Sequence, residues 1–179
     1  MILVDHQIAM LVHERGLLKP YNPAHLQPAG YDLALANQFR QPIRHVNPSS
    51  RPLHIDPWNP LLWSTTHRHS SIYDLEPHSF VLGCSEEYLK IPSNIVGVCL
   101  SRSTYARSGV FTNVTPLEPG WEGQVTIEIV NLTDDYIDLV IGKGIVQVQF
   151  HQLSEMPRAD YPQRGGRYQG QTGVTQGHS

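Results

Sequence analysis

One acidic side chain stands in the middle of an otherwise apolar, strand-like run. Glu128 lies between Ile127 and Ile129, a position where glutamate is disfavoured unless its face of the strand is wet or functional. Strand alternation puts that face on the side of Thr126 and Val130, opposite Val125, Ile127 and Ile129. If the face is enclosed, loss of solvation raises the carboxyl pKa and suits Glu128 to proton transfer near neutral pH. A solvent-facing carboxylate is the alternative.

A second group of functional side chains follows the apolar run 95–100. The segment 101–109 reads Ser-Arg-Ser-Thr-Tyr-Ala-Arg-Ser-Gly. Its arginines offer forked donors, its serines short donors and its backbone amides a cradle, so the segment suits a phosphate group. An ordinary capped turn with solvated arginines would use the same residues.

The C-terminal stretch is polar and rich in glycine, arginine and tyrosine. After Pro157 no apolar face is evident, so this tail is expected to be disordered or mobile when alone. Within 161–173, glycines allow close backbone approach, arginines supply charge, and tyrosine can lie against a base or sugar. A plain disordered tail and a flap that closes on a nucleotide both remain open.

The sequence lacks the usual zinc ligands of base deaminases, a His-x-Glu element and a Pro-Cys-x-x-Cys element. Cys84 and Cys99 are fifteen positions apart and belong to neither. His67 and His69 could place two imidazoles on one side of a strand, but a polar surface strand explains the pair equally well. We therefore expect two reduced thiols and no zinc on the protein.

Short β-rich runs must position these groups. They are expected at 31–39, 79–84, 94–100, 110–114, 124–130, 136–140 and 145–150, with turn residues between the later ones. Many short strands at close spacing are typical of a barrel or sandwich. Asp5 is expected to cap a short helix that ends at Gly16.

The segment 41–78 is rich in proline, serine and histidine. It is expected to be a long excursion with one or two short strands, anchored by Trp58 and Trp63. The whole chain of 179 residues suits one domain. A net charge of −3 argues against a nucleic-acid surface, and no apolar run reaches the roughly twenty residues of a membrane span. Without a basic leader, a cytoplasmic protein is expected.

Together these segments resemble the deoxycytidine triphosphate (dCTP) deaminases, relatives of the trimeric dUTP pyrophosphatases. The segment 103–107 matches the family's Ser-[Ser/Thr]-x-Ala-Arg element, 118–128 its acidic-Pro-x-[Trp/Phe]-x-Gly…Glu strand, and 167–171 its basic-Tyr-x-x-Gln tail. The stretch 30–33, Gly-Tyr-Asp-Leu, is similar to the family's short Tyr-Asp strand. The resemblance covers most of residues 79–175 and is patchy before them.

The resemblance implies a mainly β fold, a distorted dUTPase-like barrel of jelly-roll type with a short N-terminal helix and a mobile C-terminal tail. Residues 1–156 would form the barrel with its irregular excursion at 41–78, and residues 157–179 a flap over the nucleotide site. The assembly would be a homotrimer with sites between subunits, binding neither nucleic acid nor membrane.

The resemblance also implies a hydrolase acting on a cyclic amidine C–N bond, which converts dCTP to dUTP and ammonia in pyrimidine deoxynucleotide metabolism. Glu128 would be the general base that activates water for attack on C4, with Ser103 and Arg107 supporting the reacting centre. The expected substrate-binding residues are Arg102, Ser103, Thr104, Arg107, Asn113, Val114, Thr115, Glu118, Trp121, Tyr161, Arg167 and Gln171. Magnesium would travel with the triphosphate, and dTTP is a possible inhibitor.

Two features depart from the common family pattern. The stretch 113–118 before and into the acidic-Pro turn is the compact form of a segment that is longer in some members. Arg167 stands where lysine is frequent, which keeps the charge but changes the donor geometry.

Other functions remain open on the same barrel. Pyrophosphatases of this fold bind an attacking water through an aspartate in the acidic turn, and Glu118 occupies a related turn. A dUTP pyrophosphatase, or a bifunctional enzyme that gives dUMP, is therefore an alternative. A non-catalytic nucleotide-binding regulator is another, against which the intact Glu128 and Arg107 argue.

Overall fold

The structure is a computed structural model that describes residues 1–42, 63–67 and 71–177. Trp58, His69 and most of the excursion 41–78 lie outside the described residues, as does the side chain of Trp63. Among the described residues, no helix is long and apolar enough to cross a membrane.

The described chain is mostly β, as expected. It contains the helices α1 (Asp5–Arg15) and α2 (Ser103–Arg107), the short 3-10 helix η1 (Pro23–His25), and the strands β1 (Leu18–Lys19), β2 (Leu26–Gln27), β3 (Gly30–Pro42), β4 (Trp63–His67), β5 (Ile72–Leu75), β6 (Phe80–Lys90), β7 (Ile95–Ser101), β8 (Val110–Asn113), β9 (Glu122–Asn131), β10 (Ile137–Val140) and β11 (Gly144–Gln152).

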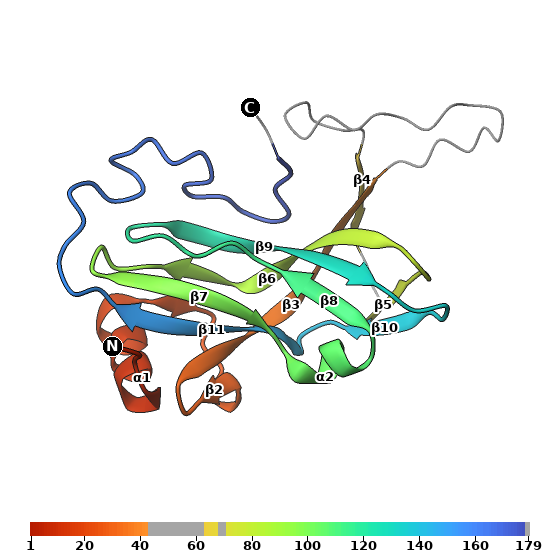
Figure 1. Ribbon diagram of the computed structural model, residues 1–179, viewed down its shortest axis with the longest axis horizontal. Helices are drawn as coiled ribbons and strands as arrows, with labels where there is room; N and C mark the ends of the chain where they lie inside the picture. The colour runs from red at the N-terminus through yellow and green to blue at the C-terminus, as the bar shows by residue number, and fades with distance from the viewer. Residues whose placement is uncertain (43–62, 68–70, 178–179) are drawn as a thin grey trace.

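The main sheet curls into a nearly closed barrel (Figure 1). Its strands follow the order β7-β11-β3-β6-β9-β8, with β1, β2 and β4 attached beside this path, while β5 and β10 form a separate pair. The end strands β7 and β8 meet through a hydrogen bond of 2.8 Å from Thr112 Oγ1 to Ser101 Oγ.

The strand β9 alternates as its sequence predicts. Val125, Ile127 and Ile129 are buried in the core, while Thr126, Glu128 and Val130 lie partly exposed on the other face. The strand β3 does not alternate, because residues 30–36 are all buried. It lies between β11 and β6 in the middle of the sheet, so both of its edges are paired.

Two local expectations needed adjustment. Helix α1 ends at Gly16, whose φ of 65° is left-handed, but its N-cap is Val4 rather than Asp5. Asp5 lies in the first turn and accepts a hydrogen bond of 2.7 Å from the His6 amide. The segment 103–107, expected as a phosphate-binding or capped turn, forms the helix α2.

The C-terminal tail packs on the sheet in the structure (Figure 1). The sequence shows no apolar face in this tail, but Val174 is buried and Tyr161 packs against the core. A single valine among polar residues gives no periodic signal, so its burial depends on the surface that it meets. Mobility of the tail stays a prediction.

Candidate active site

A cavity of about 560 Å³ lies between β9, the segment after β8 and the C-terminal tail. Its volume is in the range that holds a small-molecule ligand. Its walls combine apolar and polar side chains: Phe80, Leu82, Val114, Thr115, Pro116, Leu117, Glu118, Trp121, Val125, Thr126, Glu128, Tyr161, Tyr168, Gln171, Thr175 and Gln176. Seven of the residues expected from the sequence are therefore brought together, namely Val114, Thr115, Glu118, Trp121, Glu128, Tyr161 and Gln171.

Glu128 faces this cavity from the middle of β9. Asn113 lies directly opposite it on β8, and its side-chain Nδ2 donates a hydrogen bond of 3.0 Å to Glu128 Oε2. Burial raises the pKa of the Glu128 carboxyl above its ordinary value, and the Asn113 hydrogen bond offsets part of that increase. Asn113 thus fixes one oxygen of a carboxyl that can exchange a proton at a higher pH than a solvated glutamate.

The turn 118–121 forms one end of the cavity. Gly120 has a φ of 81°, and a Cβ at this position would lie 2.9 Å from Asp160 Oδ2, so the close approach of the tail requires glycine here. Trp121 is 5% exposed, and its indole Nε1 donates a hydrogen bond of 3.0 Å to the backbone oxygen of Tyr168. Trp121 therefore lines the cavity and also binds the tail.

The tail supplies the opposite wall. The Tyr161 hydroxyl accepts a hydrogen bond of 3.2 Å from the Tyr168 amide, and both rings line the cavity. The Gln171 side chain donates a hydrogen bond of 2.6 Å to the backbone oxygen of Gln124. Arg167 is exposed and does not line the cavity. Tyr168, which belongs to the Arg-Tyr-Gln-Gly-Gln motif, lines the cavity as well.

The structure does not bring Ser103, Thr104 or Arg107 to this cavity within one chain. All three are exposed on α2 and none lines it. The reason lies in the register of β8 and β9. Val110, the first residue of β8 after α2, pairs with Asn131, whereas Glu128 pairs with Asn113 at the far end of β8.

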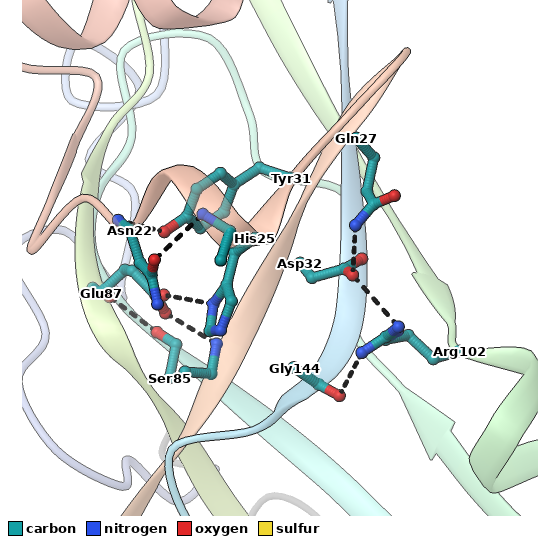
Figure 2. Close-up of polar contacts among 11 residues, drawn as sticks. Asn22, His25, Gln27, Tyr31, Asp32, Ser85, Glu87, Arg102 and Gly144 are labelled. Atoms are coloured by element: carbon teal, nitrogen blue, oxygen red, sulfur yellow. Dashed lines mark hydrogen bonds and ion pairs between the residues drawn. The ribbon is translucent and has the colours of Figure 1, made fainter. Parts of the chain in front are cut away.

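Arg102, expected on the phosphates, is held by its own chain (Figure 2). Its Nη1 donates a hydrogen bond of 3.0 Å to the Gly144 backbone oxygen, and its Nη2 lies 3.3 Å from Asp32 Oδ2. The buried Asp32 also accepts hydrogen bonds from the side chains of Gln27 and Gln147. Any Cβ at Gly144 would lie 2.9 Å from Arg102 Nη1, so glycine is needed for this contact.

A second polar cluster lies outside the cavity, around Glu87 on β6 (Figure 2). Glu87 is 2% exposed, and its Oε2 accepts a hydrogen bond of 2.9 Å from the Ala34 amide. The Tyr31 hydroxyl is hydrogen-bonded to the same carboxyl, and His25 Nδ1 lies 3.9 Å from Oε1. Burial raises the pKa of Glu87 to about 7.

Both cysteines are free thiols, as expected. Burial raises the pKa of Cys84 and of Cys99 to about 12, so neither is a thiolate near neutral pH. Within the ranges that the structure describes, no three His, Cys, Asp or Glu side chains are grouped as metal ligands. The expected pair His67 and His69 lies outside those ranges, except for the backbone of His67.

The family model for dCTP deaminase-like proteins matches residues 2–153. A dCTP deaminase of Herpetosiphon aurantiacus is 39% identical over 183 residues, which cover 97% of each chain. A dCTP deaminase of Acinetobacter baylyi is 42% identical over 185 residues, which cover 96% of this chain and 95% of the relative.

The fold is also similar to that of a solved structure. The crystal structure of 2'-deoxycytidine 5'-triphosphate deaminase from Agrobacterium tumefaciens matches with a TM-score of 0.67 and 20% sequence identity. The match covers 84% of this chain and 48% of that one, so the present chain spans about half of its length. This likeness supports the barrel fold, and the family match with the closely similar relatives decides the family. The chain belongs to the dCTP deaminase-like family.

Proposed function

We propose that this protein hydrolyses dCTP to dUTP and ammonia, with Glu128 as the general base. One observation carries the proposal. A carboxyl with a raised pKa faces a cavity of small-molecule size in a chain of the dCTP deaminase-like family. Its similar relatives from Herpetosiphon aurantiacus and Acinetobacter baylyi are dCTP deaminases.

The proposed reaction needs one group that can both accept and return a proton. Glu128 takes a proton from a water molecule as the water oxygen adds to C4 of cytosine, and the electron pair of the C4=N3 bond moves to N3. The Glu128 carboxyl then returns its proton to the 4-amino nitrogen, which leaves as ammonia, while the remaining C4 hydroxyl gives its proton to N3 and becomes the C4 carbonyl. Because burial raises its pKa, the Glu128 carboxyl can take up and release a proton at a higher pH than a solvated glutamate. The Asn113 hydrogen bond keeps the carboxyl in one orientation throughout.

We further propose a homotrimer in which a neighbouring subunit supplies Ser103 and Arg107. Both are exposed and lie away from the cavity of their own chain. Apolar side chains are also exposed on the strands that flank α2: Leu100 on β7 is 45% exposed and Phe111 on β8 is 53% exposed. A second copy that covered these side chains would bring α2 against another chain.

The triphosphate would enter as its magnesium complex, so the metal belongs to the substrate. Arg107, Thr104 and the tail residue Arg167 would then provide donors for phosphate oxygens. Arg102 would bind phosphate oxygens only through the N–H groups that are not used in its contacts with Asp32 and Gly144. The expected division into a barrel, residues 1–156, and a flap, residues 157–179, is part of the same proposal.

A second function is favoured by one observation. Glu118 lines the same cavity as Glu128, so a second carboxylate could bind a water there and direct it to the phosphates. This would make the enzyme bifunctional, with dUMP and pyrophosphate as further products.

Product analysis separates these functions. The protein is incubated with dCTP and, separately, with dUTP in the presence of magnesium, and ammonia, dUTP, dUMP and pyrophosphate are followed. We expect ammonia and dUTP in equal amounts from dCTP, and no consumption of dUTP. Release of dUMP and pyrophosphate would establish the bifunctional enzyme or, without ammonia, a pyrophosphatase. Binding of dCTP with no product at all would indicate a regulator.

A further inference from the structure

The tail continues the sheet next to the cavity. The Gly170 amide donates a hydrogen bond of 2.8 Å to the Glu122 backbone oxygen, and the Gln124 amide donates one of 2.9 Å to that of Gln171. Gly123 and Gln171 form a parallel bridge. Residues 170–175 therefore lie beside the first half of β9, which β8 leaves unpaired because it reaches only residues 128–131.

Two side chains of β9 hold the tail backbone further along. Gln124 Oε1 accepts a hydrogen bond of 2.8 Å from the Gly173 amide, while Gln124 Nε2 donates one of 2.9 Å to the Ser85 backbone oxygen. Thr126 Oγ1 accepts a hydrogen bond of 3.1 Å from the Thr175 amide. When these bonds form, the polar groups exchange water partners for protein partners, so each bond adds little stability by itself.

One apolar side chain of the tail is buried in this region. Val174 is 6% exposed and packs in a small cluster with Ala36, Leu82 and Cys84, against which Phe80 also packs. We call this cluster the Val174 seat. The Val174 seat is separate from the main core. It lies beside the cavity, since Leu82 of the seat and Phe80, which packs against it, also line the cavity. The free energy gained by burying this valine is the main term that can offset the entropy cost of ordering an otherwise polar segment.

We propose that Val174 is a positioning residue, whose burial in the Val174 seat holds the tail against β9 as a wall of the cavity that contains Glu128. Thr175 and Gln176, the next two residues, line that cavity, as does Gln171 three positions earlier. The part that concerns the reaction rests on the proposed function. The docking of the tail does not, because it depends only on contacts within the chain.

The docking is tested first, without nucleotide, by hydrogen exchange of the Gly173 and Thr175 amides. Val174→Asp places a carboxylate in an apolar seat, whereas Thr172→Asp adds the same charge at an exposed position two residues away and is the matched control. We expect exchange at least about tenfold faster in Val174→Asp, because burial of an unpaired charge is strongly unfavourable. Val174→Ala should give an intermediate rate. Equal exchange in Val174→Asp and Thr172→Asp would overturn the proposal.

The consequence for the reaction is tested by kinetics over a range of pH. When the tail leaves, water reaches Glu128 and its pKa falls toward the ordinary value, so the acidic limb of the kcat/KM profile should move to lower pH. The KM for dCTP should rise about tenfold through loss of one cavity wall. Both changes are expected in Val174→Asp and absent in Thr172→Asp. Three other ionisable side chains, Glu118, Tyr161 and Tyr168, also line the cavity. To remove the second carboxyl from the pH profile, both variants are measured again in a protein that also carries Glu118→Gln.

The two measurements fail in different ways. A wild-type protein that does not deaminate dCTP would refute the proposed function, while the exchange rates would still decide whether Val174 docks the tail. Faster exchange with an unchanged pH profile and unchanged KM would show that the docked tail plays no part in the site, and the positioning role would be wrong.

Discussion

At the scale of single residues, the environment of Glu128 separates it from Glu122, the other acidic side chain of β9. Glu122 is on the same face of the strand, but it lies near Lys90 at the beginning of β9 and outside the cavity. Glu128 is half-buried in the wall of the cavity and accepts a hydrogen bond from Asn113, and burial raises its pKa. Of these two glutamates only Glu128 lines the cavity, and its raised pKa suits a general base.

Glu128→Gln should keep nucleotide binding and lose nearly all deamination. The amide has the same shape but cannot accept and return the proton, and removal of a general base typically lowers the rate about a hundredfold to ten-thousandfold. Single-turnover formation of ammonia and calorimetric binding of dCTP measure the two properties. Glu122→Gln is the matched control and should retain wild-type rates. More than about a tenth of wild-type turnover in Glu128→Gln would contradict a general base at this position.

At the scale of elements, the pairing of β8 with β9 decides which groups can act together. It places Asn113 beside Glu128 and leaves α2 at the other end of β8. The contact of Arg102 with Asp32 and Gly144 ties the beginning of α2 to β3 and β11. Ser103 and Arg107 are thus presented on a fixed, exposed helix, which suits a role toward another subunit.

Mixed assemblies should therefore recover activity from inactive chains. Glu128→Gln and Arg107→Ala are each expected to be inactive alone. In trimers formed at random from equal amounts of both, about a quarter of the intersubunit sites combine an intact Glu128 with an intact Arg107. We expect about that share of wild-type dCTP turnover after the two chains are refolded together.

A matched mixture shows whether activity rises simply because two different chains are refolded together. Glu128→Gln mixed with Asn113→Ala contains no site with both residues intact, because Asn113 and Glu128 face each other within one chain. This mixture should stay near the level of its separate components. Failure of the first mixture to exceed the second would place the complete site within a single subunit.

At the scale of the whole molecule, Glu87 joins parts of the chain that lie on different elements. Its carboxyl on β6 accepts hydrogen bonds from the Ala34 amide of β3 and from the Tyr31 hydroxyl, and it faces His25 of η1. The negative charge of the neighbouring Glu86 adds to the effect of burial, which raises the pKa of Glu87 to about 7. The folded protein therefore binds a proton at Glu87 more tightly than the unfolded chain does.

This proton makes stability depend on pH. A folded-state pKa raised from 4.5 to about 7 gives stabilisation that is complete below pH 4.5 and is lost as pH rises through about 7. At about 1.4 kcal/mol per pKa unit, the loss is on the order of 3 kcal/mol. Glu87→Gln keeps an acceptor for the Ala34 amide and should remove this fall of stability with pH. Urea unfolding between pH 5 and 8 measures the free energy of unfolding of both proteins. If this free energy has the same pH dependence in the wild type and in Glu87→Gln, the Glu87 proton is not its source.

Much of the fold follows from local sequence patterns. The strands from β6 to β11 were predicted within a few residues, except that β6 continues to Lys90 beyond the expected 79–84. The end of α1 at Gly16 and the inward and outward faces of β9 were also predicted. These features depend on backbone conformation and on the two-residue period of a strand, which neighbouring residues determine. The family motifs likewise identified Glu128 and the turn 118–123 as candidate site elements.

The tertiary structure decided which residues meet. Whether Glu128 is enclosed, whether Arg102 is free or bound to Asp32, and whether Val174 finds an apolar seat all depend on segments far apart in the chain. The burial of Glu87 beside Tyr31 and the separation of α2 from Glu128 depend on strand register in the same way. A residue's type and local spacing say what it can do, but its pKa and its partners are set by the surface packed against it.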